Sequence, residues 1–394
     1  GTQAAVNDLL MNVWNRAVPK AIEECAALQA IADQESPTEK ITIAPWDWRY
    51  YAEKVRKARY DLDEAAIKPY LSLQNMVEAA FDCAQRLFGI TLTLRTDIPT
   101  YHPDVKVYEV RDANRLIGLF LHDNFARPSK QGGAWMSSYR LQSRIDGDVL
   151  PIVANHNNFA KGAEGSPTLL SIDDAETLFH EFGHGLHGLL SSVRYEHLSG
   201  TNVLRDFVEL PSQLYEHWLM VPEVMKRFAR HYQTGEPIPD ELIAKIKAAA
   251  TFNAGFDAVE FTASALVDMA LHAQQDLSGL DISAFEQQQL TRLGMPSAIQ
   301  MRHRLPHFLH LFAGDGYAAA YYAYLWAEVL DADAFEAFSE AGNAFDSAVA
   351  TRLHHYIYSS GGSLPPMEAY RAFRGRLPAV DAMLKKKGLL THPA

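Results

Sequence analysis

The most informative stretch for the fold is Thr177-Leu178-Phe179-His180-Glu181-Phe182-Gly183-His184-Gly185-Leu186-His187, which carries histidines within a helical pattern of apolar residues. His180 and His184 are four residues apart, so on a helix both imidazoles project from one face towards one point. Such a pair suits a zinc ion, which binds neutral imidazole nitrogen at about 2.0–2.1 Å. The stretch therefore predicts a helix that supplies two ligands to one metal ion.

Glu181 follows the first of these histidines, at the edge of the same helix face. From there its carboxylate can reach a metal-bound water without binding the metal, as in zinc peptidases that use Glu as the general base. The alternative is a surface helix that happens to carry two histidines. In a chain with 16 histidines among 394 residues, the pattern arises by chance on the order of a few per cent of the time.

A catalytic zinc needs a third protein ligand and an open position for water. His187 shares the helix face, but it lies about 10 Å along the axis from His180, too far for three ligands to converge. A variant with a later histidine requires Gly where His187 stands, so a Glu from a second helix remains. Glu196 follows the first helix too closely. The spacing leaves Glu209 and Glu216 open.

Length and composition bound the fold class. A chain of 394 residues, 48% hydrophobic and 21% charged, is typical of a globular protein with two lobes. The net charge of -12 argues against a broad nucleic-acid or anionic-membrane surface, and no apolar run reaches the ~18 residues of a membrane span. Cys25 and Cys83 are too few for a disulfide framework, so two buried thiols are expected.

Most of the chain has helical periodicity, and residues 91–160 differ. Short alternating or apolar runs at 90–94, 105–110, 116–121 and 150–154 predict a small β-sheet. The glycine-rich loop 130–136 lacks the Lys-Ser/Thr of a phosphate-binding loop, which argues against nucleotide binding. Because the chain has no linker or repeat, its lobes are expected to be interleaved by folding.

A second group of polar residues lies in the stretch 310–326, which begins at His310 and contains two glycines that predict a mobile loop. Tyr317, Tyr321 and Tyr324 follow at a spacing that predicts one face of the helix after this loop. An aromatic core stripe is the alternative interpretation. It would bury three hydroxyls that need partners, whereas donors facing a cleft would stabilise an oxyanion.

Taken together, these motifs resemble the thimet oligopeptidase family of zinc peptidases, also called family M3. The resemblance rests on His180–His184, Arg205–Glu209 with Pro211–Gln213, and the stretch 314–326. Residues 131–138 and 313–317 look most like the bacterial peptidyl-dipeptidase branch, also called dipeptidyl carboxypeptidase. The likeness runs in order from about Trp46 to Leu390. Members of the family are longer on the N-terminal side, where a helical half forms one wall of the substrate channel.

The resemblance implies a mainly α, zincin-like fold with helical lobes flanking a deep channel and a small sheet near the zinc helix. It assigns residues 1–90 to the channel-wall lobe and 91–394 to the catalytic region, with zinc helices in 171–220.

Within that region the resemblance implies one Zn²⁺ per chain, with His180, His184 and Glu209 as its ligands and Glu181 as the general base. It also implies that His310, Tyr317 and Tyr324 bind the substrate carbonyl or stabilise the oxyanion, with Tyr321 nearby in the substrate site.

Two further expectations concern the surroundings of the metal. By analogy with other zinc peptidases, an edge strand containing Ala154 and Asn155 is expected to bind the substrate main chain. Glu176 and Asp206 are expected to support the ligands, because each lies on the same helix face as one of them.

The resulting hypothesis is a zinc peptidyl-dipeptidase that removes dipeptides from the C-termini of short peptides. An oligopeptidase that cuts internal bonds and a non-catalytic peptide-binding fragment are the alternatives. The expected partners are short peptides, not nucleic acid or membrane; a separate chain carrying the absent N-terminal half is an alternative partner. A cytoplasmic location is expected, with the periplasm as the alternative.

Overall fold

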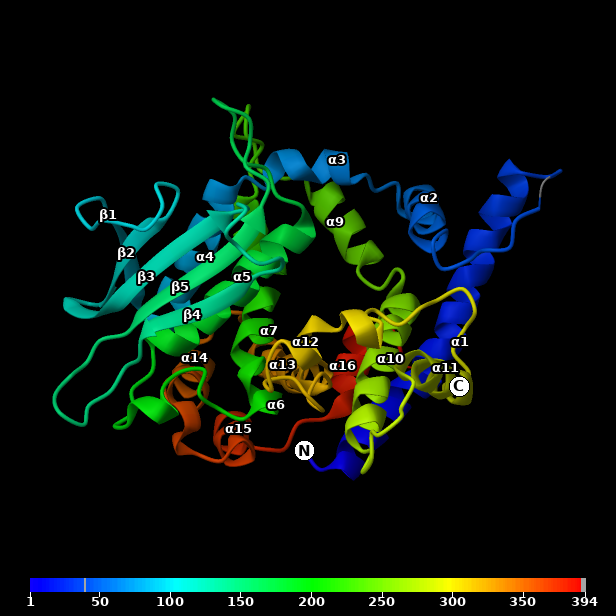
Figure 1. Cartoon of the computed structure of the whole chain (residues 1–394). Coiled ribbons are helices and arrows are strands. Elements are labelled where there is room, and N and C mark those ends of the chain that lie inside the picture. Colours follow the sequence, from blue (N-terminus) through cyan, green and yellow to red (C-terminus); the bar gives the residue numbers. More distant parts are fainter. Residues whose placement is uncertain (39, 391–394) are drawn as a thin grey trace. The chain divides into compact units, whose positions relative to one another are not determined.

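The computed structural model describes residues 1–38 and 40–390 (Figure 1). Its contacts group the chain into two compact units. One unit contains Gly1–Leu62, Ala244–Val329 and the segment from Val380, and the other contains Asp63–Ile243 and Leu330–Ala379. Each unit is built from segments far apart in the sequence, as the absence of a linker predicted.

Helices make up most of the described chain, as predicted. Their bounds are α1 (Gln3–Glu35), α2 (Trp48–Tyr60), α3 (Glu64–Ile67), α4 (Leu73–Phe88), α5 (Ile172–Leu189), α6 (Arg205–Val208), α7 (Leu210–Glu216), α8 (Pro222–Phe228), α9 (Asp240–Ala249), α10 (Ala254–His272), α11 (Ile282–Leu293), α12 (Leu309–Phe312), α13 (Ala323–Glu340), α14 (Ser347–Leu353), α15 (Pro366–Arg374) and α16 (Val380–Lys386).

A five-stranded sheet lies in the second unit, within the region where the sequence predicted one. The strands are β1 (Ile90–Arg95), β2 (Lys106–Asp112), β3 (Arg115–Phe125), β4 (Trp135–Arg140) and β5 (Ile152–Phe159), in the order β1-β2-β3-β5-β4. Neighbours are antiparallel except β3 and β5, which are parallel.

The expectation that Ala154 and Asn155 lie on an edge strand is therefore wrong. Ala154 and Asn155 lie on β5, which pairs with β3 on one side and β4 on the other, and both residues are fully buried. The sequence interpretation missed β4 because its first residues were assigned to the glycine-rich loop 130–136. Within the described sheet, β4 is the edge strand next to β5.

Helices α4 and α5 pack on one face of this sheet, which explains why residues 63–90 group with it rather than with the N-terminal helices (Figure 1). Phe81 of α4, Phe120 of β3 and Phe182 of α5 meet there, with the Phe182 ring centroid 5.2 Å from Phe81 and 5.3 Å from Phe120. The compact units change at Leu62 and Asp63, and the division after residue 90 into a channel-wall lobe and a catalytic region stays a prediction.

In the first unit, α1 packs along α10. The approach is close at Gly255, where a Cβ would lie 2.5 Å from the backbone nitrogen of Ala21. Glu24 of α1, which is 8% exposed, accepts backbone hydrogen bonds from Gly255 at 3.0 Å and from Phe256 at 2.9 Å. A buried carboxylate thus satisfies the first amides of α10, which have no acceptor within their own helix.

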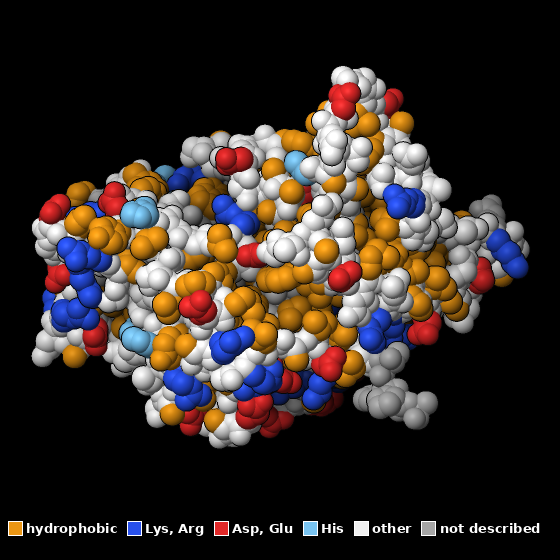
Figure 2. Space-filling view, turned by 90° about the horizontal axis from the view of Figure 1, so that it is seen from below, with side chains coloured by type: hydrophobic (Ala, Val, Ile, Leu, Met, Phe, Trp, Pro, Cys, Tyr) orange, Lys and Arg blue, Asp and Glu red, His pale blue; other side chains and the backbone are white. Residues whose placement is uncertain are grey.

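The surface carries a mixture of positive and negative side chains, as the composition of a typical globular protein leads one to expect. On the face drawn in Figure 2, Lys and Arg side chains are interspersed with Asp and Glu side chains. Among the described residues, no helix is both long enough and apolar enough to cross a bilayer. The two cysteines are free thiols, with Cys83 buried and Cys25 half-buried.

Candidate metal centre

Helix α5 is fixed at its start and along its length by local sequence. Ser171 caps its N-terminus, with the Ser171 Oγ accepting from the Asp174 amide at 3.0 Å and the Asp174 carboxylate accepting from the Ser171 amide at 3.1 Å. Gly183 allows α7 to approach, because a Cβ there would lie 2.6 Å from the Cα of Ser212. The helix that carries the two histidines is thus held directly against α7.

Glu209 lies at the break between α6 and α7, with φ -82° and ψ -10°. Pro211 stands in the first turn of α7, a position that tolerates proline because its missing N–H would have no helical partner. The break between α6 and α7 lies next to this proline. It directs the Glu209 side chain towards α5.

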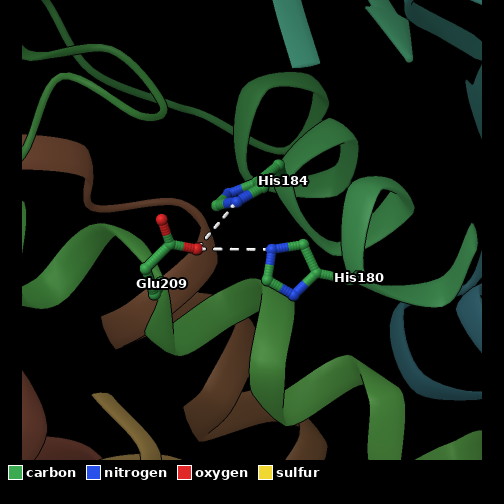
Figure 3. A group of neighbouring side chains, drawn as sticks. All are labelled: His180, His184 and Glu209. Atoms are coloured by element: carbon green, nitrogen blue, oxygen red, sulfur yellow. Dashed lines mark ion pairs between the residues drawn. The ribbon is translucent and has the colours of Figure 1, made fainter. Parts of the chain in front are cut away.

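The structure brings His180, His184 and Glu209 together (Figure 3). The Glu209 Oε2 lies 3.3 Å from the Nε2 of His180 and 3.1 Å from the Nε2 of His184, and the three ligand atoms lie within 4.8 Å of one another. Ligands bound at about 2.0–2.1 Å in a tetrahedral zinc site lie about 3.3 Å apart. Two imidazole nitrogens and one carboxylate oxygen at these separations fit a metal ion of that kind.

Glu216 occupies a different position from Glu209. Its Oε1 lies 2.6 Å from the Nδ1 of His180, on the ring edge opposite the nitrogen that faces Glu209. Ser212 supports the other ligand, because its hydroxyl donates to the Glu209 Oε2 at 3.2 Å. The structure thus places Glu209 in the group that could hold a metal ion and Glu216 outside it, against His180. The roles of Glu209 as a ligand and of Glu216 as a support of His180 stay predictions. The supporting roles of Glu176 and Asp206 stay predictions.

The charges of the three side chains depend on one another. Burial opposes a positive charge on His180, but its hydrogen bonds to Glu209 and Glu216 outweigh burial and raise its pKa well above the usual value. Burial would raise the pKa of Glu209, yet the two histidines hold that pKa well below the usual value. The site therefore concentrates a carboxylate charge at the point where both imidazoles converge.

Glu181 is 6% exposed and lies beside this group on α5. Burial raises its pKa above that of an ordinary glutamate, against the opposing effect of the two neighbouring histidines. Its Oε2 has no hydrogen-bond partner among the described residues. A buried carboxylate with raised pKa and a free oxygen can act as a general base.

His187 stays outside the group, as the helix rise predicted. It is fully buried, and burial lowers its pKa to about 3, so its ring is neutral. Neither ring nitrogen of His187 has a hydrogen-bond partner within the described parts of the chain.

The second predicted group lies in the first unit and is a turn rather than a helix. Tyr317 and Tyr321 precede the first residue of α13, so only Tyr324 is helical. The prediction of one helix carrying all three tyrosines is wrong because Ala319, between Tyr317 and Tyr321, adopts φ +55°, a left-handed conformation that no α-helix contains.

The aromatic rings of this turn are nevertheless brought together. The Tyr317 and Tyr324 rings stack at 5.5 Å, and the His310 ring lies 5.8 Å from Tyr317 and 5.4 Å from Tyr321. Tyr321 is 3% exposed and stacks on Phe261, which favours a packing role for it. The contacts of these residues with substrate stay predictions.

The structure combines a mainly helical fold and a small sheet with a helix-borne His-Glu-x-x-His group and a distant Glu. This combination is typical of the metallopeptidase class. The chain belongs to peptidase family M3, because the model of that family matches residues 1–389. The resemblance found in the sequence is thus confirmed.

Two curated relatives carry the likeness further. Dipeptidyl carboxypeptidase of Escherichia coli is 44% identical over 391 residues, which make up 98% of this chain and 56% of that protein. Oligopeptidase A of Escherichia coli is 39% identical over 393 residues, with 98% and 57% covered. The chain therefore spans little more than half the length of these relatives. A solved chain described as "BsuCP Crystal Structure" shares the fold, with a TM-score of 0.52 at 12% identity over 99% of this chain and 67% of that one.

Proposed function

We propose that the chain is the metal-binding part of a zinc-dependent peptidyl-dipeptidase, which removes dipeptides from the C-termini of short peptides. The observation that carries the proposal is the convergence of His180, His184 and Glu209 beside the buried Glu181. The 44% identity to a dipeptidyl carboxypeptidase supports the substrate class.

In this proposal His180, His184 and Glu209 hold the zinc ion, and Glu216 keeps the His180 ring in place through its Nδ1. A bound zinc ion would supply a Lewis acid and an acidified water to the site. Glu181 accepts a proton from the attacking water at its carboxylate. It then passes that proton to the nitrogen of the leaving dipeptide as the C–N bond breaks.

The peptide main chain needs a partner, and β4 takes the role first expected of β5. Edge strands bind an extended peptide through backbone hydrogen bonds without selecting its sequence. Among the described strands, β4 pairs only with β5, and it is half-buried at Trp135 and Met136. We therefore expect the substrate main chain to pair with β4, and not with Ala154 and Asn155 of β5.

His310, Tyr317 and Tyr324 keep the roles implied by the resemblance, which are to bind the scissile carbonyl or stabilise the developing oxyanion. Their hydroxyl and imidazole groups are the right donors for that task. Tyr321, being buried, is expected to support the others from below rather than to touch the reacting atoms.

The second candidate function is an oligopeptidase that cuts internal bonds, and the 39% identity to an oligopeptidase A favours it. A peptide with an amidated C-terminus separates the two. A peptidyl-dipeptidase should fail on the amidated peptide and cleave the free acid, whereas an oligopeptidase should cleave both.

Metal dependence tests the proposal as a whole. Chelation should abolish cleavage of a short peptide, and return of one equivalent of Zn²⁺ should restore it. A protein that binds zinc and peptide yet hydrolyses nothing would instead support the non-catalytic alternative. Electrophoresis of the same sample would show whether a separate chain with the N-terminal half accompanies this one.

A further inference from the structure

A second buried carboxylate in the first unit has no place in the proposed mechanism. Asp268 of α10 is fully buried, and it faces the turn that precedes α13. Its Oδ1 accepts from the Ala319 amide at 2.9 Å, and its Oδ2 accepts from the Tyr321 amide at 3.0 Å. The residues that meet here are about 50 positions apart in the chain, so this is a tertiary contact and not a local cap.

The turn itself explains why it needs this contact. The Ala320 amide donates to the Tyr317 carbonyl at 2.9 Å, and the Ala323 amide donates to the Ala320 carbonyl at 3.0 Å. The two amides that Asp268 binds, those of Ala319 and Tyr321, flank Ala320 and take no part in these two bonds. Ala319 has φ +55°, a conformation that a residue with a Cβ adopts only when its surroundings impose it.

His272 completes the arrangement one helical turn further along α10. Its Nδ1 lies 2.7 Å from the Asp268 Oδ1. Both carboxylate oxygens are thus occupied, one of them twice, and the carboxylate has one orientation in which all three contacts are made. A backbone bound at two amides, two residues apart, cannot rotate about Ala319 without losing one of them.

We propose that Asp268 is a positioning residue for Tyr317, in this turn, and Tyr324, just after it in α13. By binding the amides of Ala319 and Tyr321, Asp268 fixes the backbone that holds the two tyrosine rings in their stacked arrangement. This inference rests on the proposed function, in which those two tyrosines act on the substrate. It adds a residue that neither touches substrate nor binds metal.

Asp268→Asn tests the role with little change in shape. The amide oxygen can accept one N–H, but the amide nitrogen is a donor and leaves the other backbone N–H without an acceptor. Glu24→Gln is the matched control in the same unit, because the Glu24 carboxylate is also buried and also accepts two backbone amides, those of Gly255 and Phe256.

Hydrogen exchange measures the contact without any reaction. Peptides that cover residues 316–324 should exchange faster in Asp268→Asn than in the parent, whereas in Glu24→Gln they should be unchanged. Exchange in 316–324 that is equal in the parent and Asp268→Asn would overturn the proposal.

Kinetics on the zinc-loaded protein measure the consequence. Misplacing a group by about 1 Å costs up to about 100-fold in rate, so Asp268→Asn should lower kcat and kcat/KM about 10- to 100-fold with KM little changed. Glu24→Gln should stay near the parent at equal zinc content. If the parent is active and Asp268→Asn has the same kcat and kcat/KM as Glu24→Gln, the role of Asp268 is overturned and the proposed function is not. If the zinc-loaded parent is itself inactive, the proposed function is overturned, and the role of Asp268 with it.

A double-mutant cycle shows whether Asp268 acts through the tyrosines. If it does, Asp268→Asn combined with Tyr324→Phe should be scarcely slower than the slower single variant, and independent effects would multiply instead. Should Asp268→Asn fail to fold, His272→Ala takes its place, with a smaller loss of kcat expected in the same cycle. Multiplying losses, or no loss in His272→Ala, would count against the proposal.

Discussion

Glu209 and Asp268 are both buried carboxylates, with exposures of 2% and 0%, yet they differ in what surrounds them. Two imidazoles face Glu209 and hold its pKa well below the usual value, in spite of burial. Two backbone amides and one imidazole face Asp268, and there burial prevails and raises the pKa. The difference follows the number of imidazoles: two face Glu209 and only one, that of His272, faces Asp268, and a histidine can carry a charge that a backbone amide cannot.

The difference teaches what each carboxylate can do. An imidazole nitrogen that loses its proton offers a lone pair, so the partners of Glu209 can turn from donors into metal ligands. Two of the three partners of Asp268 are backbone amides, which always donate, so this carboxylate holds a segment of chain. The partners of a buried acid therefore separate a candidate metal centre from a candidate clamp.

The largest expected effect comes from a substitution that removes the proton acceptor beside the candidate metal centre and keeps the geometry of that centre. Glu181→Gln should retain zinc and lose about 10²- to 10⁴-fold in kcat, because the amide cannot accept a proton from water. Zinc content and steady-state kinetics check this together. Normal turnover by a zinc-loaded variant would show that Glu181 is not the base.

A third buried carboxylate extends the comparison. Asp123 is fully buried and binds Arg127 through two contacts of 2.6 Å, with Lys130 at 3.3 Å; burial would raise its pKa, but these cations hold it well below the ordinary 3.8. Asp123→Asn should destabilise the fold by about 3–5 kcal/mol, since it removes the negative charge that pairs with the buried Lys130 ammonium and the half-buried Arg127 guanidinium.

The lowered pKa of Asp123 determines whether its contribution to the free energy of unfolding rises or falls with pH. Because the folded-state pKa of Asp123 is lowered, its contribution to the free energy of unfolding is present above pH 3.8 and is lost as pH falls through the folded value. Asp268, with its raised pKa, should contribute in the opposite sense, most below 3.8 and less as pH rises. Denaturant unfolding of the parent and of each Asn variant across acidic pH measures both slopes. A parent and an Asp123→Asn variant with equal slopes would refute the assignment.

On the side of the tyrosine turn, Tyr324→Phe and Tyr317→Phe should lower kcat and kcat/KM together by about 10²- to 10³-fold, as the loss of an oxyanion donor does. Hydroxyls that only pack would change stability by about 1 kcal/mol and leave kcat alone. Kinetics beside melting temperatures separate the two cases. If kcat stays within about threefold in both variants, the catalytic interpretation of these tyrosines fails.

The smallest expected effect concerns the outer contact of the metal centre. Glu216→Gln should weaken zinc binding about 10- to 100-fold, because the carboxylate no longer fixes the His180 ring. At saturating zinc its kcat should approach that of the parent. A competition titration with a chelator measures the affinity, and an unchanged value would make Glu216 a surface contact only.

The parts of the site that the sequence predicted are those held by local periodicity. His180, Glu181 and His184 lie within one turn of a regular helix, so their spacing alone determines their relation. Glu209 and Glu216 could not be separated in that way. Their difference depends on the helix break at Glu209 and on the packing of α7 against α5, which no spacing records.

The parts that were missed depend on distant partners. The turn at Ala319 is stabilised by Asp268, some 50 residues earlier, so the tyrosine spacing by itself favoured a helix. Strand β4 is short and follows Gly132 and Gly133, which indicated a loop; only pairing with β5 gives it an extended form. Residues whose conformation is imposed from elsewhere in the chain carry little local signal.

Gly183 has no side chain and takes no part in any proposed step, yet its place against Ser212 constrains the candidate metal centre. Even a methyl group there would meet backbone rather than a flexible side chain, so α7 would have to move, and Glu209 directly precedes the first residue of that helix. Mutational tolerance around the ligands is therefore governed by empty volume as much as by chemistry. A variant library should therefore show low tolerance at Gly183, a residue whose contribution is the lack of a side chain.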